Sequence, residues 1–461
     1  KLNIKNIKEL EKAAKQGKIK KIAGLGPTVE KNILKSIEFA KASGKRFLLG
    51  YASDIAEEIK NRLEKLKQVN KVEVAGSLRR KKETIGDIDI LITSNNPAKV
   101  MDFFTGMDDV QDILAKGHTK SAVRLKEGIQ ADVRVIAEKN YGAALLYFTG
   151  SKQHNIALRK IAIKKGMKLS EYGLFNKKTN KMLVGKTEQE CYKKLGLKYI
   201  EPEIREEEGE IELAEKNKLP KLIGYNDLKS DLQLHTKWSD GNNTIMEMAQ
   251  AAKKLGLKYI CITDHTGQLK IANALDEKRI KKQRKEIDKA NKQLKNFTIL
   301  QGTEVNIKAD GNLDMKNNIL KELDIVIAAI HSGFKNSKEK ITQRLIKAME
   351  NEHVDIIGHP FGRLMNIRPS YEMDFDKILE KAKQTNTILE INAYPARLDL
   401  NDVHIRAAVK AGVKLSIGTD AHEANELRYY KLGIATARRG WATKKDIINT
   451  YSVRDMLKLL K

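Results

Sequence analysis

The sequence predicts a multidomain α/β protein, and three observations support this fold class. Residues 71–93 alternate apolar and polar side chains on either side of a Gly-Ser turn, which indicates two strands of one sheet. From residue 231 onward, apolar segments alternate with amphipathic helical patterns, which predicts a parallel α/β barrel over residues 229–461. Residues 201–220 are acidic and bracketed by prolines, which predicts a linker at 201–228.

Length and composition narrow the possible classes of protein. A chain of 461 residues suits about three domains. No apolar run approaches the length of a membrane span and no signal-peptide pattern is present, so we expect no membrane partner. Cys191 and Cys261 share no motif, which favours the reducing cytoplasm as the location.

Charge is distributed unevenly along the chain. Residues 1–200 contain 42 Lys and Arg against 22 Asp and Glu, whereas residues 201–461 contain 45 against 38. A strongly basic front half suits nucleic acid, because Lys and Arg that neutralise phosphates release counterions. For any single lysine, a general compositional bias of the genome is the alternative. The chain begins with Lys1 instead of Met, from which we expect a truncated start.

Residues 3–43 show apolar side chains at helical spacing, interrupted by a turn that contains Gly24 and Gly26. A Gly-x-Gly turn lets the backbone approach a ligand and points N–H groups of the second helix toward a phosphate. The pattern at residues 1–44 resembles a helix-hairpin-helix, which binds the DNA backbone independently of sequence. An ordinary helical hairpin is the alternative.

Asp87 and Asp89 form the first candidate site. They lie two residues apart on a predicted strand, so their carboxylates project from the same face. Neighbouring carboxylates repel each other, which favours a cation between them, and Mg²⁺ suits carboxylate and phosphate oxygens. Gly76, Ser77 and the arginines at 79–80 offer N–H groups, a hydroxyl and guanidinium groups to a triphosphate. The alternative is a strand pair with an exposed acidic edge.

The stretch GSLRRKKETIGDIDIL, residues 76–91, resembles the family X DNA polymerases, which have a nucleotidyltransferase fold. The resemblance implies a palm with a mixed sheet at residues 45–140, a subdomain for the nucleotide and nascent base pair at 141–200, and fingers that contain the helix-hairpin-helix. It also implies a set of residues that contact the incoming nucleotide: Arg46, Gly76, Ser77, Arg80, Gly86, Tyr147, Phe148, Gly150, Asn155 and Arg159. For Tyr147 and Phe148, a role as core aromatic residues is the alternative.

Asp132 is the candidate for a third carboxylate. It alternates with Val133 and Val135 on a predicted strand and so faces away from them. Three aspartates could hold two metal ions, one at the primer 3′-hydroxyl and one at the triphosphate. A solvent-facing strand residue is the alternative.

The second candidate site lies beyond Asp231, where seven of the nine histidines occur. Successive apolar segments are each followed by ligand-type residues, and the C-terminal ends of parallel strands meet at one face of a barrel. His, Asp and Glu side chains that converge there suit transition metals, which activate water and neutralise a phosphoryl group.

The stretches DLQLHTKWSDG, TDH, GTE, AAIHS, GHP and GTDAH resemble the PHP phosphoesterase family, which has a distorted α/β barrel. The resemblance implies the metal ligands His235, Asp240, His265, Glu304, His331, His359, Asp420 and His422. Gln233 occupies the place of the first histidine of a His-x-His pair, and because an amide oxygen coordinates weakly, we expect one metal to be held more loosely. His118, His353 and His404 lie outside the pattern, and we interpret them as ordinary residues.

Together the resemblances cover essentially the whole chain and point to the prokaryotic family X DNA polymerases with a C-terminal PHP domain. They imply template-directed, gap-filling DNA polymerase activity with Mg²⁺ or Mn²⁺ in the palm, and a 3′–5′ exonuclease with two or three Mn²⁺ or Zn²⁺ ions in the barrel. The expected partners are primed or gapped DNA and deoxynucleoside triphosphates, and the expected state is a monomer. The lyase-like N-terminal domain of this family, which binds the 5′-phosphate side of a gap, is expected to be absent.

Two other functions remain open at this stage. One is a metal-dependent phosphoesterase for a small substrate, with the palm as a relic; the intact Asp87, Asp89 and Asp132 argue against it. The other is a non-catalytic DNA-binding repair scaffold, which two full sets of metal ligands disfavour. Primer extension with and without a metal chelator would separate these functions.

Overall fold

The computed structural model describes residues 7–19, 46–268 and 272–461. It contains a first helix, α1 (Ile7–Lys15), before the main body of the protein. The turn that carries Gly24 and Gly26 in the predicted helix-hairpin-helix lies outside the described residues.

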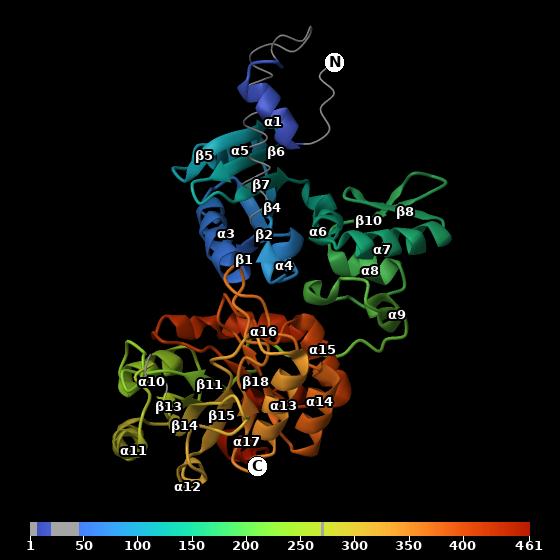
Figure 1. Cartoon of the computed structure of the whole chain (residues 1–461). Helices are drawn as coiled ribbons and strands as arrows, with labels where there is room; N and C mark the ends of the chain where they lie inside the picture. The colour runs from blue at the N-terminus through green and yellow to red at the C-terminus, as the bar shows by residue number, and fades with distance from the viewer. Residues whose placement is uncertain (1–6, 20–45, 269–271) are drawn as a thin grey trace.

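A mixed sheet of five strands forms the centre of the N-terminal part (Figure 1). In spatial order its strands are β2 (Val69–Val74), β4 (Asp87–Ser94), β7 (Gln130–Val135), β6 (Lys120–Leu125) and β5 (Val110–Lys116). Strands β4 and β7 are parallel, and the other neighbours are antiparallel. Ile88, Ile90 and Ile92 on β4 pack into one core with helices α3 (Leu49–Glu64) and α5 (Pro97–Thr105). The predicted mixed sheet is confirmed.

Three short elements lie near the beginning of strand β4, where Asp87 and Asp89 are located. They are β1 (Phe47–Leu48), β3 (Thr84–Ile85), which pairs with β1, and α4 (Gly76–Arg79), which follows β2 directly. A helix-and-sheet unit comes next along the chain, made of η1 (Glu138–Asn140), α6 (Tyr141–Thr149), α7 (Lys152–Lys164), β8 (Met167–Ser170), β9 (Gly173–Asn176), β10 (Met182–Val184) and α8 (Glu188–Lys194).

The segment at 201–228, which the sequence predicts to be a linker, lies between the two parts of the chain and is largely folded. It contains η2 (Pro202–Ile204) and α9 (Glu210–Glu215). Ile204 and Ile211 are buried in the core of the preceding unit. The segment is therefore folded onto its neighbours along much of its length.

Two acidic residues of this segment, Glu203 and Glu210, are buried and paired. Glu203 binds the guanidinium group of Arg438 at 2.7 Å, and Glu210 lies 2.7 Å from Nδ1 of His154. Buried charges are tolerated when they are paired and hydrogen-bonded. Acidic composition alone cannot distinguish such pairs from a solvated chain.

Seven parallel strands form the C-terminal barrel. In order they are β11 (Ser230–Leu234), β12 (Tyr259–Ile262), β14 (Thr298–Asn306), β15 (Ile325–Ala329), β16 (Ile356–Ile357), β17 (Ile388–Asn392) and β18 (Leu415–Gly418). Strand β13 (His265–Thr266) pairs with β14 beside this path. A bridge between Leu234 and Ala421 brings the two ends together, so the barrel is nearly closed. The predicted parallel barrel is confirmed.

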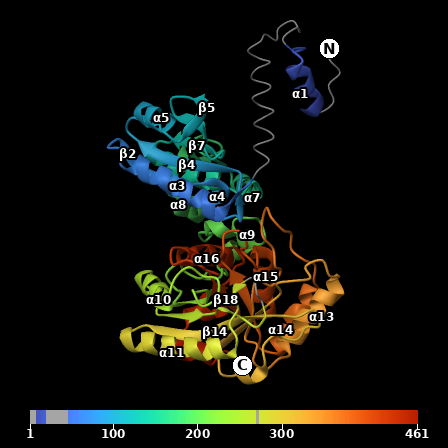
Figure 2. The same ribbon diagram turned by 60° about the vertical axis from the view of Figure 1, so that its left-hand side comes forward.

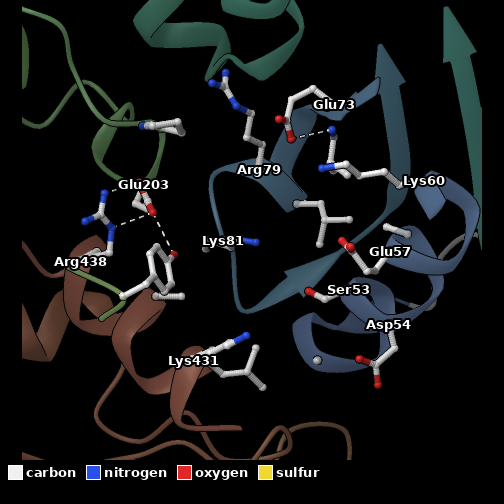
Figure 3. Close-up of a pocket in the computed structure, with 18 of the residues that line it drawn as sticks. Ser53, Asp54, Glu57, Lys60, Glu73, Arg79, Lys81, Glu203, Lys431 and Arg438 are labelled. Atoms are coloured by element: carbon white, nitrogen blue, oxygen red, sulfur yellow. Dashed lines mark hydrogen bonds and ion pairs between the residues drawn. The ribbon is translucent and has the colours of Figure 1, made fainter. Parts of the chain in front are cut away.

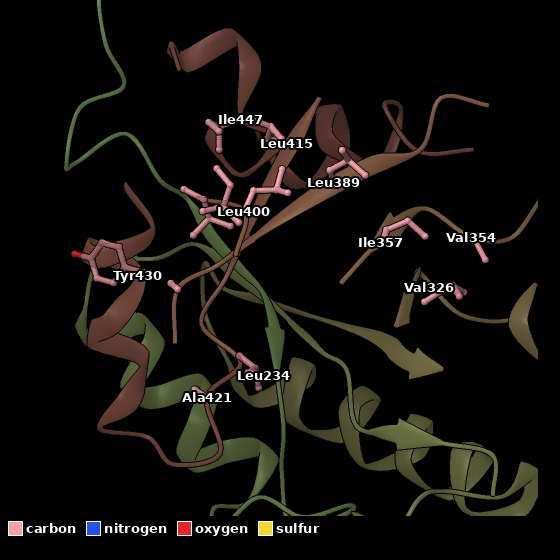
Figure 4. Close-up of a cluster of buried hydrophobic side chains, with 14 of the residues drawn as sticks. Leu234, Val326, Val354, Ile357, Leu389, Leu400, Leu415, Ala421, Tyr430 and Ile447 are labelled. Carbon is pink, nitrogen blue, oxygen red and sulfur yellow. The ribbon is translucent and has the colours of Figure 1, made fainter. Parts of the chain in front are cut away.

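Helices cover the outside of the barrel (Figures 1 and 2). They are α10 (Ile245–Lys254), α11 (Glu277–Gln293), α12 (Asn317–Leu320), α13 (Lys338–Met349), α14 (Phe375–Gln384), α15 (Asp402–Ala411), α16 (Tyr430–Arg439) and α17 (Val453–Leu457), with the short turns η4 (Glu426–Tyr429), η5 (Lys444–Asp446) and η6 (Ile448–Thr450). Val326, Leu389, Leu415 and Tyr430 belong to one buried apolar cluster shared by strands and helices (Figure 4). This packing leaves the intervening strand residues facing the barrel interior.

Helix α16 lies on the side of the barrel that faces the N-terminal part (Figures 1 and 2). Leu398 of the barrel is fully buried within the apolar core of the mixed sheet. A cavity of about 860 Å³ remains between the two parts, and Lys81 of the first and Lys431 of the second both line it (Figure 3). The two parts therefore share packed surface as well as a solvent-accessible gap. In the described residues we find no helix with the length and apolarity needed to span a membrane.

Two candidate active sites

The three predicted aspartates lie on one side of the mixed sheet. On β4, Asp87 and Asp89 stay outside the core while Ile88 between them is fully buried. The register of the parallel pair places Asp89 directly beside Asp132 on β7, where Asp132 alternates with the buried Val133. The structure thus brings the three carboxylates together on neighbouring strands, β4 and β7.

Burial and nearby negative charge change the ionisation of Asp87 and Asp89. Burial and the neighbouring Asp87 and Asp132 raise the pKa of Asp89 to about 7. Burial and Asp132 also raise the pKa of Asp87. A bound cation would relieve this repulsion, so the oxygen donors fit a hard divalent ion such as Mg²⁺.

Gly76 makes room for Asp89. Its φ angle is +60°, and a Cβ atom at this position would lie 2.2 Å from Oδ2 of Asp89. Glycine satisfies both the left-handed backbone and the close approach. The Gly-Ser turn in the sequence is therefore a packing requirement of the carboxylate site.

A pocket of about 520 Å³ opens beside the aspartates, which is an ordinary size for a small-molecule site. Asp87 and Asp89 line it. So do all the predicted nucleotide-binding residues, namely Arg46, Gly76, Ser77, Arg80, Gly86, Tyr147, Phe148, Gly150, Asn155 and Arg159. Lys82 and Lys152 also line the pocket, and the sequence analysis did not predict them; lysines are too common in this chain for position alone to single them out.

The two aromatic residues at the end of α6 have different surroundings. Tyr147 is 37% exposed, and Asn155 of α7 donates a hydrogen bond to its backbone oxygen at 2.7 Å. Phe148 packs against the guanidinium group of Arg134, 4.6 Å from the ring centroid. Tyr147 is thus open to a ligand, whereas Phe148 is partly a packing residue.

The two adjacent arginines of the basic loop also separate. Arg80 lines the pocket and donates from Nη1 to the backbone oxygen of Thr149 at 2.5 Å. Arg79 turns the other way and forms a bidentate pair with Glu188, at 2.7 and 2.8 Å. Of the arginine pair at 79–80, therefore, Arg80 faces the pocket and Arg79 joins α4 to α8.

Glu304 is the centre of the candidate site in the barrel. Its Oε1 lies 2.9 Å from Nε2 of His331 and 2.9 Å from Nε2 of His359. Its Oε2 lies 3.3 Å from Nε2 of His235, which in turn lies 3.2 Å from Asp420. One buried carboxylate therefore touches histidines from several strand ends, as a parallel barrel predicts.

Asp240 forms a second focus beside the first. Its carboxylate oxygens lie between 3.5 and 3.8 Å from ring nitrogens of His235, His265 and His422. Among the described residues, sets of three or more ligand atoms that all lie within 4.8 Å of one another occur in the barrel: His235, Asp240, His265 and His422; His265, Glu304 and His331; His235, Glu304 and Asp420.

The barrel residues fit metal ions because several of their buried nitrogen atoms have no hydrogen-bond partner among the described residues. Both ring nitrogens of His235, and Nδ1 of His265, His331 and His359, make no hydrogen bond to the described residues. Buried polar atoms are normally hydrogen-bonded, so such a group of orphans calls for a ligand. Imidazole and carboxylate donors together suit Mn²⁺ or Zn²⁺.

Gln233 points into this cluster, as its position beside His235 predicts. It is fully buried, and its amide nitrogen donates to Oε2 of Glu304 at 3.0 Å. Its carbonyl oxygen has no hydrogen-bond partner in the described structure. That oxygen is the atom available to a metal ion.

Glu390 on β17 also lies in this cluster and was not predicted from the sequence. This carboxylate is buried and accepts a hydrogen bond from the backbone N–H of His359 at 2.7 Å. A Cβ atom at Gly418 would lie 2.3 Å from its Oε1 and 2.6 Å from Cβ of Gln233, so Glu390 and Gln233 meet at one point of the interior. The signal was present as an apolar strand, Ile388–Asn392, with a glutamate at its centre.

Two histidines outside the predicted set, His404 and His154, contact aromatic or carboxylate side chains away from the metal-ligand cluster. The ring of His404 stacks on Phe361 with centroids 3.9 Å apart. The ring of His154, which the sequence left without a role, lies between Glu210 and Tyr192. Asp264, although adjacent to His265, accepts hydrogen bonds from its own neighbourhood, including Oγ of Ser239 at 2.5 Å.

Family models match three parts of the chain. The DNA polymerase beta palm matches residues 51–156, the DNA polymerase beta thumb matches residues 144–206, and the PHP domain matches residues 231–394. The first two matches together contain Asp87, Asp89, Asp132 and most of the residues that line the pocket beside them. The third contains the His-rich ends of the barrel strands up to β17.

Individual relatives give the same division. A Bacillus subtilis (strain 168) protein named DNA polymerase/3′-5′ exonuclease PolX is 42% identical over 462 residues, which cover 100% of this chain and 81% of the relative. A probable phosphatase of Thermoanaerobacter sp. (strain X514) is 35% identical over 248 residues, 48% of this chain and 91% of the relative. A probable phosphatase of Vibrio parahaemolyticus is 32% identical over 251 residues, 51% of this chain and 94% of the relative.

Proposed function

We propose a division of labour between the two sites, on the premise that this chain belongs to the family X DNA polymerases that carry a C-terminal PHP domain. The protein is a template-directed DNA polymerase with a second, metal-dependent 3′–5′ exonuclease activity. The observation that supports the division best is the pocket in which Asp87 and Asp89 meet every predicted nucleotide-binding residue, separate from the His-rich cluster around Glu304.

In the palm, we propose that Asp87, Asp89 and Asp132 hold two Mg²⁺ or Mn²⁺ ions. When bound, such ions would supply positive charge to the primer 3′-hydroxyl and to the triphosphate. The fixed register of β4 and β7 holds the carboxylates in place before substrate arrives. The protein thereby contributes preorganised charge, which is the main source of catalysis in phosphoryl transfer.

The residues around the pocket orient the nucleotide. Arg46, Ser77 and Arg80 bind the triphosphate through guanidinium and hydroxyl donors. The turn after α6 places Tyr147 and Gly150 against the sugar. Asn155 and Arg159, one helical turn apart on α7, face the minor groove of the nascent base pair.

In the barrel, the eight predicted ligands and Gln233 hold two or three Mn²⁺ or Zn²⁺ ions. When bound, such ions would supply Lewis acidity to water and to the phosphodiester that is hydrolysed. Glu304 contacts His331 and His359 through Oε1 and His235 through Oε2, and so fixes the spacing of these histidines. Five of the eight ligands are buried, which limits the access of competing water to their coordinating atoms: His235, His265, Glu304, His359 and Asp420.

The partners follow from these activities and from the charge of the chain. The basic front half binds primed or gapped DNA through its phosphates, and deoxynucleoside triphosphates enter the palm pocket. We propose a monomer that works in the cytoplasm. Both cysteines are buried and unpaired, which agrees with a reducing location.

Two assays with the full chain test the proposal. Primer extension should require a divalent metal and be abolished by a chelator and by Asp89→Ala. Hydrolysis of a single-stranded oligonucleotide should require the barrel ligands. The probable phosphatases that match the barrel alone favour a second candidate, a phosphoesterase with a relic palm, which would hydrolyse phosphoesters but extend no primer.

A further inference from the structure

Arg439, the last residue of α16, links the barrel to the polymerase pocket. Its Nη1 donates to the backbone oxygen of Arg80 at 2.8 Å and to Oε1 of Glu206 at 3.1 Å. Its Nε donates to Asp402 at 2.9 Å, which ties the guanidinium group to α15 of the barrel. The side chain is only 5% exposed, so these bonds form in a largely desolvated place.

Glu206 is shared between two arginines. The same Oε1 atom that accepts from Arg439 also accepts from Nε of Arg80 at 3.1 Å. Arg80 is thereby held by its backbone oxygen, by Nε through Glu206, and by Nη1 through Thr149. Within the described structure this leaves Nη2 of Arg80 free for a phosphate oxygen in the pocket.

We infer that Arg439 is a positioning residue of the triphosphate subsite, so that the PHP domain completes the nucleotide pocket of the polymerase. An arginine side chain carries substantial rotamer entropy, and a guanidinium group already fixed in its binding geometry loses less of it when a ligand arrives. Arg439 supplies this fixation from the barrel, through Arg80 itself and through Glu206. The inference rests on the proposed role of Arg80 in triphosphate binding.

A purely structural role for Arg439 would give a different pattern from a positioning role. Arg438, the preceding residue on α16, is also a buried interdomain arginine, 10% exposed. It binds Glu203 at 2.7 Å and the backbone oxygen of Ile223 at 2.7 Å, and it touches neither Arg80 nor Glu206. It therefore serves as a matched control for general damage to the interface.

The test is single-nucleotide insertion by the full chain with saturating primer-template and varied deoxynucleoside triphosphate. Arg439→Gln should raise KM for the nucleotide about tenfold, equivalent to about 1.4 kcal/mol, and change kcat little. Glu206→Gln should shift KM in the same direction, and it serves as the second variant if Arg439→Gln does not fold. Arg438→Gln should lower the melting temperature but leave KM near the wild-type value, and oligonucleotide hydrolysis should persist in Arg439→Gln.

Two outcomes would overturn the inference. One is an unchanged KM in both Arg439→Gln and Glu206→Gln while the wild type extends primers. The other is an equal rise of KM in Arg438→Gln, which would mean that any damage to the interface has this effect. Failure of the wild type to insert nucleotides would instead refute the proposed polymerase function.

Discussion

At the scale of single residues, the barrel site is organised by the carboxylate of Glu304, which contacts His331, His359 and the amide nitrogen of Gln233. Ligand-type residues at strand ends were predictable, because each follows an apolar run that reads as a buried strand. Glu390 was not predictable in the same way, since it lies within its strand, among Ile388, Leu389 and Ile391, where a charged residue contradicts the usual apolar pattern. The fold tolerates it because a backbone N–H group and Asn392 reach its carboxylate.

Gln233 should contribute to hydrolysis although it replaces a histidine. Its amide nitrogen orients Glu304, and its free carbonyl oxygen faces the cluster, so Gln233→Ala should slow hydrolysis of a single-stranded oligonucleotide about tenfold. Gln233→His should keep activity, because imidazole is the stronger donor to late transition metals. Rates are measured with Mn²⁺ and Zn²⁺ separately, with primer extension as the control. Equal rates for all three proteins would place this position outside the working site.

Gly76 should be intolerant of a side chain. Gly76→Ala would push a Cβ atom against Oδ2 of Asp89, and displacement of a reacting group by about 1 Å can cost about 100-fold in rate. The measurement is primer extension, with hydrolysis expected to stay normal. Gly128→Ala is the control for backbone strain, since its φ angle of +89° is also positive, but a Cβ atom there would lie 4.0 Å from its nearest neighbour. Similar losses in both variants would show that backbone strain, and not the contact with Asp89, is responsible.

At the scale of elements, regular strands were easier to predict than the acidic connection between the two parts. Alternation along β4 and β7 follows directly from a sheet with one buried face, so the position of Asp132 could be predicted from Val133 and Val135. The connection could not, because its burial depends on partners far away in sequence, such as Arg438 for Glu203. Long-range charge pairing leaves no local pattern.

Helix α8 offers a measurable case of such pairing. Glu188 at its start binds both Arg79 of α4 and the fully buried Arg205. Although burial favours the neutral form, these two guanidinium groups lower the pKa of Glu188 to about 2. Removal of one partner from a buried pair leaves an uncompensated charge.

Glu188→Gln should therefore lower the free energy of unfolding by about 3–5 kcal/mol at neutral pH. Because the folded-state pKa is depressed, the stabilisation is present above the ordinary glutamate pKa and is lost as pH falls toward 2. The difference between wild type and variant, measured by urea denaturation, should shrink below about pH 4.5. Glu215→Gln, at an exposed position of α9, should change stability by less than about 0.5 kcal/mol. A difference independent of pH would mean that Glu188 acts through its shape and not its charge.

At the scale of the whole molecule, the uneven charge should govern DNA binding. Residues 1–200 carry 20 more Lys and Arg than Asp and Glu. The logarithm of the DNA affinity should fall as the logarithm of the salt concentration rises, with a slope of about −0.9 for each phosphate that these residues neutralise. The measurement is titration of labelled primed DNA at several salt concentrations. An affinity that does not change with salt would mean that these basic residues do not neutralise DNA phosphates.

The two activities should be separable by single substitutions, because their ligands lie on different sheets with separate cores. Asp89→Ala removes a carboxylate that faces Asp87 and Asp132, and it should lower extension about 1000-fold, or about 4 kcal/mol in activation free energy, while hydrolysis continues. His331→Ala removes a partner of Glu304 and should have the reverse effect.

The doubly substituted protein decides whether the sites are independent. If they are, its two losses should equal those of the single variants, since effects at distant sites add. Arg439 connects the barrel to Arg80 and not to the carboxylates. Melting temperatures near the wild-type value establish that each variant is folded. Loss of both activities from either single substitution, in folded protein, would show that the barrel and the palm share one catalytic unit.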